Sequence, residues 1–149
     1  MTRPTIILRH RRENLKKCSL SGLEGHSDLQ FLIYPKDPLP DLSSYILLAV
    51  GAPELSQKDS DHGVFLIDAT WRLSERILRQ CPPMQMRSLP THFRTAYPRR
   101  QTECTDPEKG LASIEALYLA HLILGRSVSL LLDGYHWKDQ FLHLNRLKT

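Results

Sequence analysis

Two uninterrupted apolar runs constrain the fold of this chain more than any other feature of its sequence. One covers Tyr45 to Val50 and ends at Gly51, and the other covers Gly63 to Asp68. A short apolar run that ends at a turn residue is typical of a strand buried on both faces. Such strands occur mainly in parallel sheets whose two faces are covered by helices. The two runs therefore predict an α/β fold with a parallel sheet in the N-terminal half.

The other patterned segments place strands first and helices last. Short apolar and β-branched runs predict further strands at residues 5–8, 29–34 and 86–89. Apolar residues at helical spacing predict helices at residues 111–124 and 137–147. A cap at Thr70 and the stop at Cys81-Pro82-Pro83 predict a helix at 70–80, and we expect a short helix at 128–132 before Gly134. Prolines are frequent between residues 83 and 107, where we expect a long functional loop. We expect one compact domain over residues 1–149, with an α/β half and its basic N-terminal loop at 1–80, and a loop and helical half at 81–149.

The composition argues against several classes of protein. No apolar run reaches the roughly 18 residues that span a bilayer, so no membrane segment is expected. The apolar run after Pro4 is too short for a signal peptide, and we expect a cytoplasmic protein. The three cysteines lie far apart, so we expect no disulfide framework. The histidines lack the spacing of metal ligands, so we expect no metal site. Neither a glycine-rich dinucleotide motif nor a P-loop motif occurs in the sequence.

The charge is unevenly distributed along the chain. Residues 1–17 hold six Lys or Arg against one Glu, and residues 69–103 hold seven Arg against two Glu. Residues 18–68 hold two Lys against eight acids. Two basic segments are typical of a protein that binds a polyanion, although a solvated basic face gives the same pattern. The predominance of Arg in the second segment favours phosphate recognition, because a guanidinium offers a planar fork of donors.

Two acidic positions are candidates for chemistry. Asp68 ends a predicted buried strand just before the helix at Thr70, and ligands of open α/β sheets bind beyond the carboxyl ends of the strands. The structural alternative is that Asp68 caps the helix while Trp71 packs in the core. Glu115 lies in the first turns of the helix that opens near Leu111, where it could simply favour the helix dipole.

Four segments, in order along the chain, resemble the S-adenosylmethionine (SAM)-dependent aminocarboxypropyltransferases that act on small-subunit ribosomal RNA. They are Arg12–Leu23, Gly63–Trp71, Arg87–Ala116 and Trp137–Asn145. The first contains Lys-Lys-Cys-Ser, as the family block Asp-Pro-Lys-Lys-Cys-Ser does, and the second is similar to the family strand that ends in Asp-Cys-Ser-Trp. The third resembles a series of Arg-x-Leu-Pro, Ala-Asn-Pro and Leu-Ser-x-Val-Glu-Ala. The fourth resembles Trp-Gly-x-x-Phe-Leu-x-Leu-Asn.

A second family also resembles part of the chain. The tRNA uridine aminocarboxypropyltransferases, named for an Asp-Thr-Trp motif, fit Asp68 to Trp71 and the pair Arg99–Arg100. Their N-terminal cysteine cluster is missing here, so this family ranks second. The chain departs from the first family at Tyr97–Gln101 and in the loop Ala49–Pro53.

The first resemblance implies a SPOUT-like fold with a trefoil knot that binds SAM. It implies transfer of the 3-amino-3-carboxypropyl group to N3 of a uridine or pseudouridine, with release of methylthioadenosine. Asp68 is then expected to take the N3 proton, its pKa raised by partial burial, while Trp71 walls the pocket and Glu115 positions the substrate or a loop. The residues expected to bind the cofactor are Leu48, Ala49, Trp71, Leu89, Leu111 and Ser113.

Ribosomal RNA, or tRNA for the second family, is the expected partner of a monomeric protein. The residues expected to bind RNA are Arg9, Arg11, Arg12, Lys16, Lys17, Arg72, Arg76, Arg94, Arg99 and Arg100. The target base must be unpaired or flipped for its N3 to be reached. Two further alternatives remain open at this point, an RNA methyltransferase and a non-catalytic RNA-binding factor of ribosome assembly.

Overall fold

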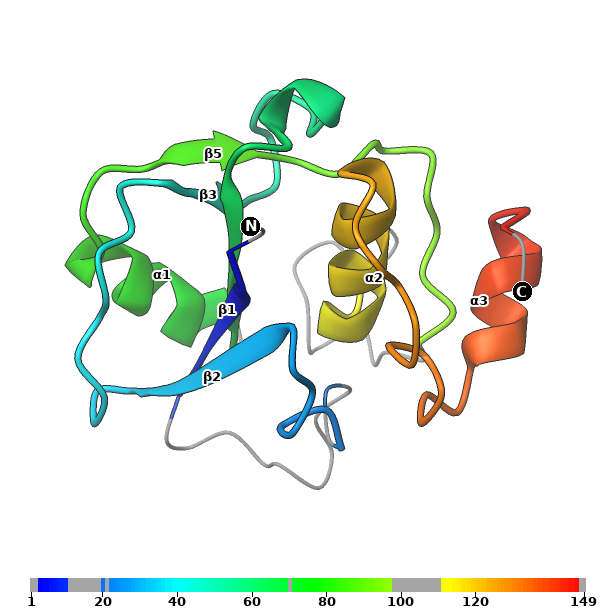
Figure 1. Cartoon of the computed structure of the whole chain (residues 1–149), viewed down its shortest axis with the longest axis horizontal. Coiled ribbons are helices and arrows are strands. Elements are labelled where there is room, and N and C mark those ends of the chain that lie inside the picture. The colour runs from blue at the N-terminus through cyan, green and yellow to red at the C-terminus, as the bar shows by residue number, and fades with distance from the viewer. Residues whose placement is uncertain (1–2, 11–19, 21, 70, 98–110, 148–149) are drawn as a thin grey trace.

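A five-stranded parallel sheet forms the centre of the molecule (Figure 1). The computed structural model describes residues 3–10, 20, 22–69, 71–97 and 111–147, with the backbone alone for Trp71 and Arg72. The strands are β1 (Thr5–His10), β2 (Leu29–Tyr34), β3 (Tyr45–Leu48), β4 (Gly63–Asp68) and β5 (Gln85–Arg87). They lie in the order β2-β1-β4-β3-β5, and every neighbouring pair is parallel. The expected α/β fold on a parallel sheet is confirmed.

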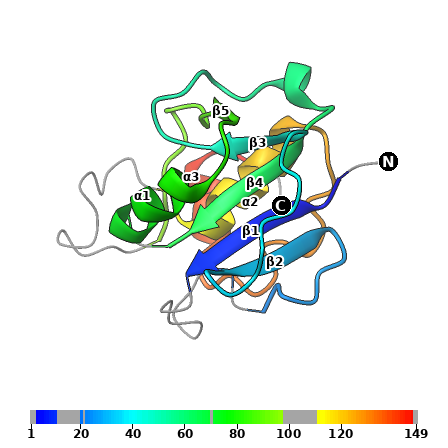
Figure 2. The ribbon, with the colours of Figure 1, turned by 90° about the vertical axis from the view of Figure 1, so that its left-hand side faces the viewer.

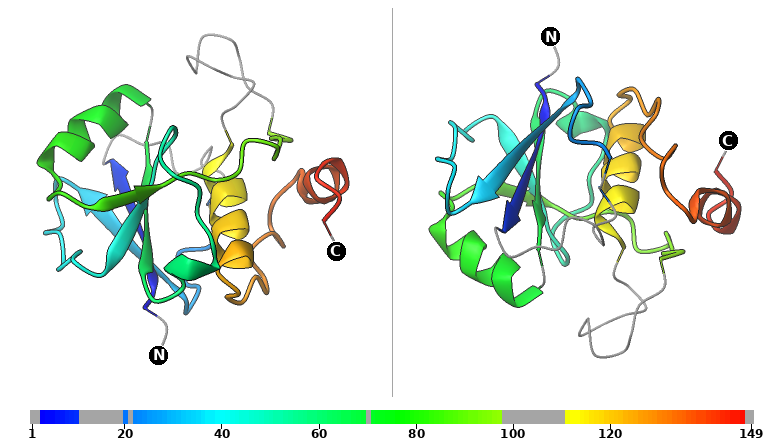
Figure 3. Two further views of the ribbon diagram at one scale, coloured as in Figure 1. Left: turned by 90° about the horizontal axis from the view of Figure 1, so that it is seen from above. Right: turned by 90° about the horizontal axis from the view of Figure 1, so that it is seen from below.

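Helices cover both faces of the sheet. Helix α1 (Trp71–Gln80) lies on one face, and α2 (Ser113–Ile123) lies on the other (Figures 1 and 2). Helix α3 (Lys138–Leu144) lies outside α2, so this side of the molecule has two helical layers (Figure 3). A short 3-10 helix, η1 (Gln57–Asp59), lies in the connection between β3 and β4. No helix among the described residues is long and apolar enough to cross a membrane.

Side chains of strand β1 pack into the core on both faces of the sheet. All six residues of β1 are buried. Ile6 and Leu8 pack in the cluster that contains Ile77 of α1, whereas Ile7 packs in the cluster that contains Leu117 of α2. Successive side chains of a strand point to opposite faces, so Thr5 and Arg9 lie on the α2 face together with Ile7. This alternation places polar side chains at both ends of the α2 face.

The C-terminus of α2 follows a recognised capping pattern. Gly125 has a positive φ of 74° and donates from its backbone N–H to the carbonyl of Leu122. The next residue, Arg126, donates to the carbonyl of His121 over 2.8 Å. These two bonds form a Schellman motif, which needs a left-handed residue that glycine adopts without strain. The cap fixes where the backbone leaves the helix and therefore where Arg126 lies.

Most predicted elements are confirmed, with differences at their ends. The strand at 29–34 and the one at Gly63–Asp68 have the predicted bounds, and β1 extends the predicted strand to residue 10. The helix predicted at 128–132 is wrong, because this segment contains turns and Leu130 has a φ of 68°, outside the helical region. The third predicted strand ends at Leu48 rather than Val50, and Val50 is almost fully exposed.

Substitution of Gly63 by alanine is expected to destabilise the fold, because Gly63 lies opposite Tyr45 in the register. A Cβ at Gly63 would lie 2.6 Å from Tyr45 Cδ2, and the Tyr45 hydroxyl is tied to the carbonyl of Pro4 over 2.9 Å. Overpacking of this kind costs about 1 to 3 kcal/mol. Urea denaturation of Gly63→Ala measures this loss. Gly134→Ala is the control, because a Cβ there meets nothing within 4 Å, and equal stability of the two variants would contradict the prediction.

Candidate functional site

The carboxyl ends of β1 and β4 bring a buried charge pair to one edge of the sheet. Arg9 and Asp68 are register partners in these neighbouring strands. The Nε atom of Arg9 lies 3.5 Å from Oδ2 of Asp68, and the two side chains are only 4% and 9% exposed. The guanidinium carbon of Arg9 also lies 4.4 Å from the centroid of the Phe31 ring, which is within the range of cation–π attraction. Arg9 therefore contacts Asp68 from the neighbouring strand β1.

A hydroxyl from α2 contacts the other oxygen of the same carboxylate. Ser113 donates from Oγ to Oδ1 of Asp68 over 2.6 Å. Ser113 is the first residue of α2, so the N-terminus of this helix meets the carboxyl end of β4 at this bond. Asp68 is 6% exposed and lies at the edge where open α/β sheets bind ligands. The contacts of Asp68 with Arg9 and Ser113 do not require that Asp68 cap the helix that follows it.

Apolar side chains lie at the same edge of the sheet. Leu48 ends β3, Leu89 follows β5, and Leu111 precedes α2. All three are half-buried and pack against the core cluster on the α2 face. Ala49 is also half-buried and packs on the α1 side. The apolar residues predicted to bind the cofactor therefore come from three segments that end at one edge, each with part of its surface accessible.

Glu115 is fully buried and holds several segments together. Its Oε1 accepts from the Thr95 hydroxyl over 2.6 Å and from the backbone N–H of Ala112 over 2.9 Å. Its Oε2 accepts from the backbone N–H of Ala96 over 2.8 Å and from the Tyr135 hydroxyl over 2.9 Å. The bond to Ala112 is one half of a capping box for α2. Glu115 is fully buried, and the expected role of positioning a loop fits these contacts, while a part in catalysis stays a prediction.

Asn145 holds the same loop from the other side. Its Oδ1 accepts from the backbone N–H of Arg94 over 2.7 Å, and its Nδ2 donates to the carbonyl of Arg94 over 2.8 Å. The loop at residues 94–96 is thus anchored to α2 by Glu115 and to the end of α3 by Asn145. Asn145 is the last residue of the fourth sequence motif, but the motif alone does not predict what Asn145 contacts.

The structure separates the predicted RNA-binding residues into three groups. Arg76 on α1 and Arg94 in the anchored loop are exposed, as contact with phosphate requires. Arg9 is 3% exposed, which corrects its assignment to the RNA surface: it lies in β1 and not in the basic loop. The remaining predictions lie outside the described residues or side chains, and they are Arg11, Arg12, Lys16, Lys17, Arg72, Arg99 and Arg100.

The Trp71 side chain also lies outside the description, so its expected contact with the cofactor stays a prediction. Two contacts of the site could not be found from sequence patterns. The ion pair of Arg9 with Asp68 joins residues 59 positions apart, and the Ser113 bond joins residues separated by 45. Parallel pairing of β1 and β4 would have been the signal for the first, since it places the two strand ends side by side.

Glu115→Gln is expected to lower the free energy of unfolding by about 1 to 3 kcal/mol, because an amide nitrogen cannot accept the bonds that one carboxylate oxygen accepts now. Thermal and urea denaturation measure the loss. The matched control is Glu75→Gln, an exposed position on α1 that should leave stability within the error of the wild type. A Glu115→Gln protein as stable as the Glu75→Gln protein would show that the buried carboxylate does not anchor the loop.

Comparison with solved structures gives a likeness over nearly the whole chain. The fold is similar to that of the SAM-dependent rRNA:acp-transferase Tsr3 from Vulcanisaeta distributa, with a TM-score of 0.74 and 24% identity. The alignment covers 98% of this chain and 80% of that one. No family model matches the chain, and neither does any curated protein. This solved structure is of an rRNA acp-transferase, the family that the sequence motifs resemble. This chain has the fold of the rRNA acp-transferase Tsr3.

Proposed function

We propose that this protein transfers the 3-amino-3-carboxypropyl group of SAM to N3 of a uridine or pseudouridine in small-subunit ribosomal RNA. One observation carries the proposal: the likeness to an acp-transferase extends over 98% of the chain and therefore includes the edge that holds Asp68. The order of the four sequence motifs supports the same reaction. The trefoil knot is a part of this proposal that rests on the sequence resemblance. The monomeric state is also proposed, and a cytoplasmic location is proposed from the absence of a signal-peptide pattern in the sequence.

The described residues fit an adenosine-bearing ligand at this edge. Leu48, Leu89 and Leu111 offer partly exposed apolar surface from three segments, which suits the faces of a purine ring. When bound, SAM supplies carbon atoms that are activated by its sulfonium, and the binding geometry decides which of them is attacked.

Asp68 is proposed as the group that accepts the proton from N3 of the base. Bound SAM would supply the γ-carbon of its amino-acid arm as the electrophile and methylthioadenosine as the leaving group, while Asp68 takes the proton that N3 loses. Arg9 and Ser113 are proposed as positioning residues, because each contacts one oxygen of Asp68 and together they fix the plane of the carboxylate. A base held in one orientation loses less entropy at the moment of transfer. The proposed role of Trp71 is to wall the pocket next to Asp68.

The RNA is proposed to approach across the exposed arginines on the two sides of this edge. Arg94 is presented by a loop that Glu115 and Asn145 both anchor, which keeps its backbone fixed while the side chain remains exposed. Arg76 lies on α1, on the other face of the sheet. Arginine in such positions binds phosphate through its planar donor fork, and a target base in a single-stranded loop could then enter the site.

Asp68→Asn is expected to abolish transfer while SAM binding stays within a few fold of the wild type. Asparagine has nearly the same shape and can accept the Ser113 bond, but its amide is a poor base. Transfer to rRNA fragments and SAM affinity by calorimetry are the measurements, with a thermal melt to confirm folding. Asp139→Asn, an exposed position on α3, is the control. Full transfer activity in Asp68→Asn would remove Asp68 from the role of base.

Arg76→Gln combined with Arg94→Gln is expected to weaken rRNA binding and to reduce its salt dependence. Each phosphate contact that is lost lowers the slope of log affinity against log salt by about one. Filter binding at several salt concentrations gives this slope. Lys58→Gln, which removes an exposed charge on η1, is the control. If the double variant and the control show the same salt slope, Arg76 and Arg94 do not contact the RNA phosphates.

A further inference from the structure

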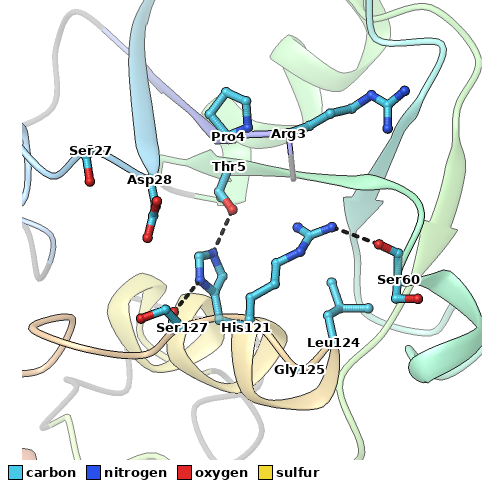
Figure 4. Close-up of a pocket in the computed structure, with 11 residues that line it drawn as sticks. Arg3, Pro4, Thr5, Ser27, Asp28, Ser60, His121, Leu124, Gly125 and Ser127 are labelled. Carbon is cyan, nitrogen blue, oxygen red and sulfur yellow. Dashed lines mark hydrogen bonds between the residues drawn. The ribbon is translucent and has the colours of Figure 1, made fainter. Parts of the chain in front are cut away.

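A cavity lies at the edge of the sheet opposite Asp68, where β1 begins and α2 ends (Figure 4). Its volume is about 500 Å³, which lies within the range that small-molecule sites occupy. The lining residues that matter here are Arg3, Thr5, Asp28, Ser60, His121 and Arg126. Of the predicted catalytic, cofactor-binding and RNA-binding residues that the structure describes, none lines it. The alternation along β1 explains the separation, because Thr5 and Arg9 share one face at the two ends of the strand.

Two arginines of this cavity are held by backbone carbonyls and not by carboxylates. Arg3 donates from Nη1 to the carbonyl of Asp61 over 2.9 Å. Arg126 donates from Nη2 to the carbonyls of Ser60 and His62. Neither guanidinium has an ion-pair partner among the described residues, and Nη1 of Arg126 is buried without a hydrogen-bond acceptor there. The pair thus holds two positive charges and donor capacity that the chain itself leaves unused.

The two charges also disfavour one another. Burial lowers the pKa of Arg126; the nearby Tyr45 opposes this, and the positive charge of Arg3 lowers the pKa further. A charge that is partly desolvated beside a like charge is stabilised when an anion binds between or beside them. Guanidinium groups match the oxygen spacing of phosphate and bind it through two parallel bonds.

The other residues that line the cavity determine which chemical groups a bound anion can carry. His121 is a fixed wall of the cavity, because its Nε2 contacts the Thr5 hydroxyl at 2.7 Å and its Nδ1 contacts the carbonyl of Ser127 at 3.1 Å. Burial lowers the pKa of His121, which keeps the ring neutral at pH 7, so it adds no positive charge. Asp28, just before β2, lines the side away from Arg3 (Figure 4). A carboxylate there repels a bare anion but accepts bonds from sugar hydroxyls.

We propose that this cavity binds a ribonucleotide, with its phosphate on Arg3 and Arg126 and its sugar hydroxyls toward Asp28. The ligand is either a free nucleotide or a phosphate-bearing nucleotide of an RNA chain, since both present the same groups. The proposal does not rest on the proposed transferase function, because no described residue of the cavity belongs to the edge that holds Asp68.

The test titrates the wild-type protein with inorganic phosphate, adenosine 5′-monophosphate and a short single-stranded RNA, each followed by two-dimensional NMR of the backbone amides. We expect the amides of Thr5, Gly125 and Arg126 to shift in a saturable manner, while that of Ser113 does not. The nucleotide should bind more tightly than inorganic phosphate, because only the nucleotide reaches Asp28. Tighter binding of the free nucleotide than of RNA identifies a small-molecule site, and the reverse order identifies an RNA contact.

Arg3→Gln and Arg126→Gln are each expected to weaken nucleotide binding roughly tenfold or more, because each removes a charge-assisted bond to phosphate. Arg3 is exposed, so Arg3→Gln tests the site even where Arg126→Gln loses stability. Arg79→Gln, an exposed arginine on α1, should bind as the wild type does. SAM affinity should be unchanged in all three variants. Absence of saturable binding, or equal affinity in Arg3→Gln and Arg79→Gln, would overturn the proposal.

Discussion

The ion pair between Arg9 and Asp68 connects the fold of this protein to its candidate site. The two residues are register partners in β1 and β4, and Ser113 brings the N-terminus of α2 to the same carboxylate. Removal of one member of a buried ion pair leaves the other charge without compensation, which commonly costs about 3 to 5 kcal/mol. The position of Asp68 is therefore set by contacts from a strand and a helix on separate parts of the chain. A carboxylate fixed in this way suits chemistry that needs a defined direction of proton transfer.

A second buried carboxylate, Glu115, organises the surface next to this pair. It lies two residues after Ser113 on α2, and its four bonds reach Thr95, Ala96, Ala112 and Tyr135. Asn145 adds bonds to both backbone groups of Arg94. The first turn of α2 thus positions both the loop on one side and Asp68 on the other. A substrate bound at this edge would meet two segments whose mutual placement depends on a single helix.

The sequence predicted the fold class well because its signals are local. Continuous apolar runs predict β3 and β4, helical spacing predicts α2 and α3, and a cap with a proline stop predicts α1. Val128, Leu131 and Leu132 are apolar, which favours a helix at 128–132, but in the structure they pack from turns. The burial of Arg9 and Glu115 could not be predicted from the sequence, for a different reason. Their burial depends on partners distant in sequence, and a charged residue in a basic or acidic context gives no local sign of such a partner.

We propose that the edge around Asp68 directs the amino-acid arm of SAM, rather than its methyl group, toward RNA. This can be measured by incubating the purified protein with unmodified small-subunit rRNA and two preparations of SAM, one labelled in the carboxyl group and one in the methyl group. We expect the carboxyl label to enter the RNA, and nucleoside mass spectrometry to find an aminocarboxypropyl group on a uridine-type base. Entry of the methyl label, or of neither label, would contradict this proposal.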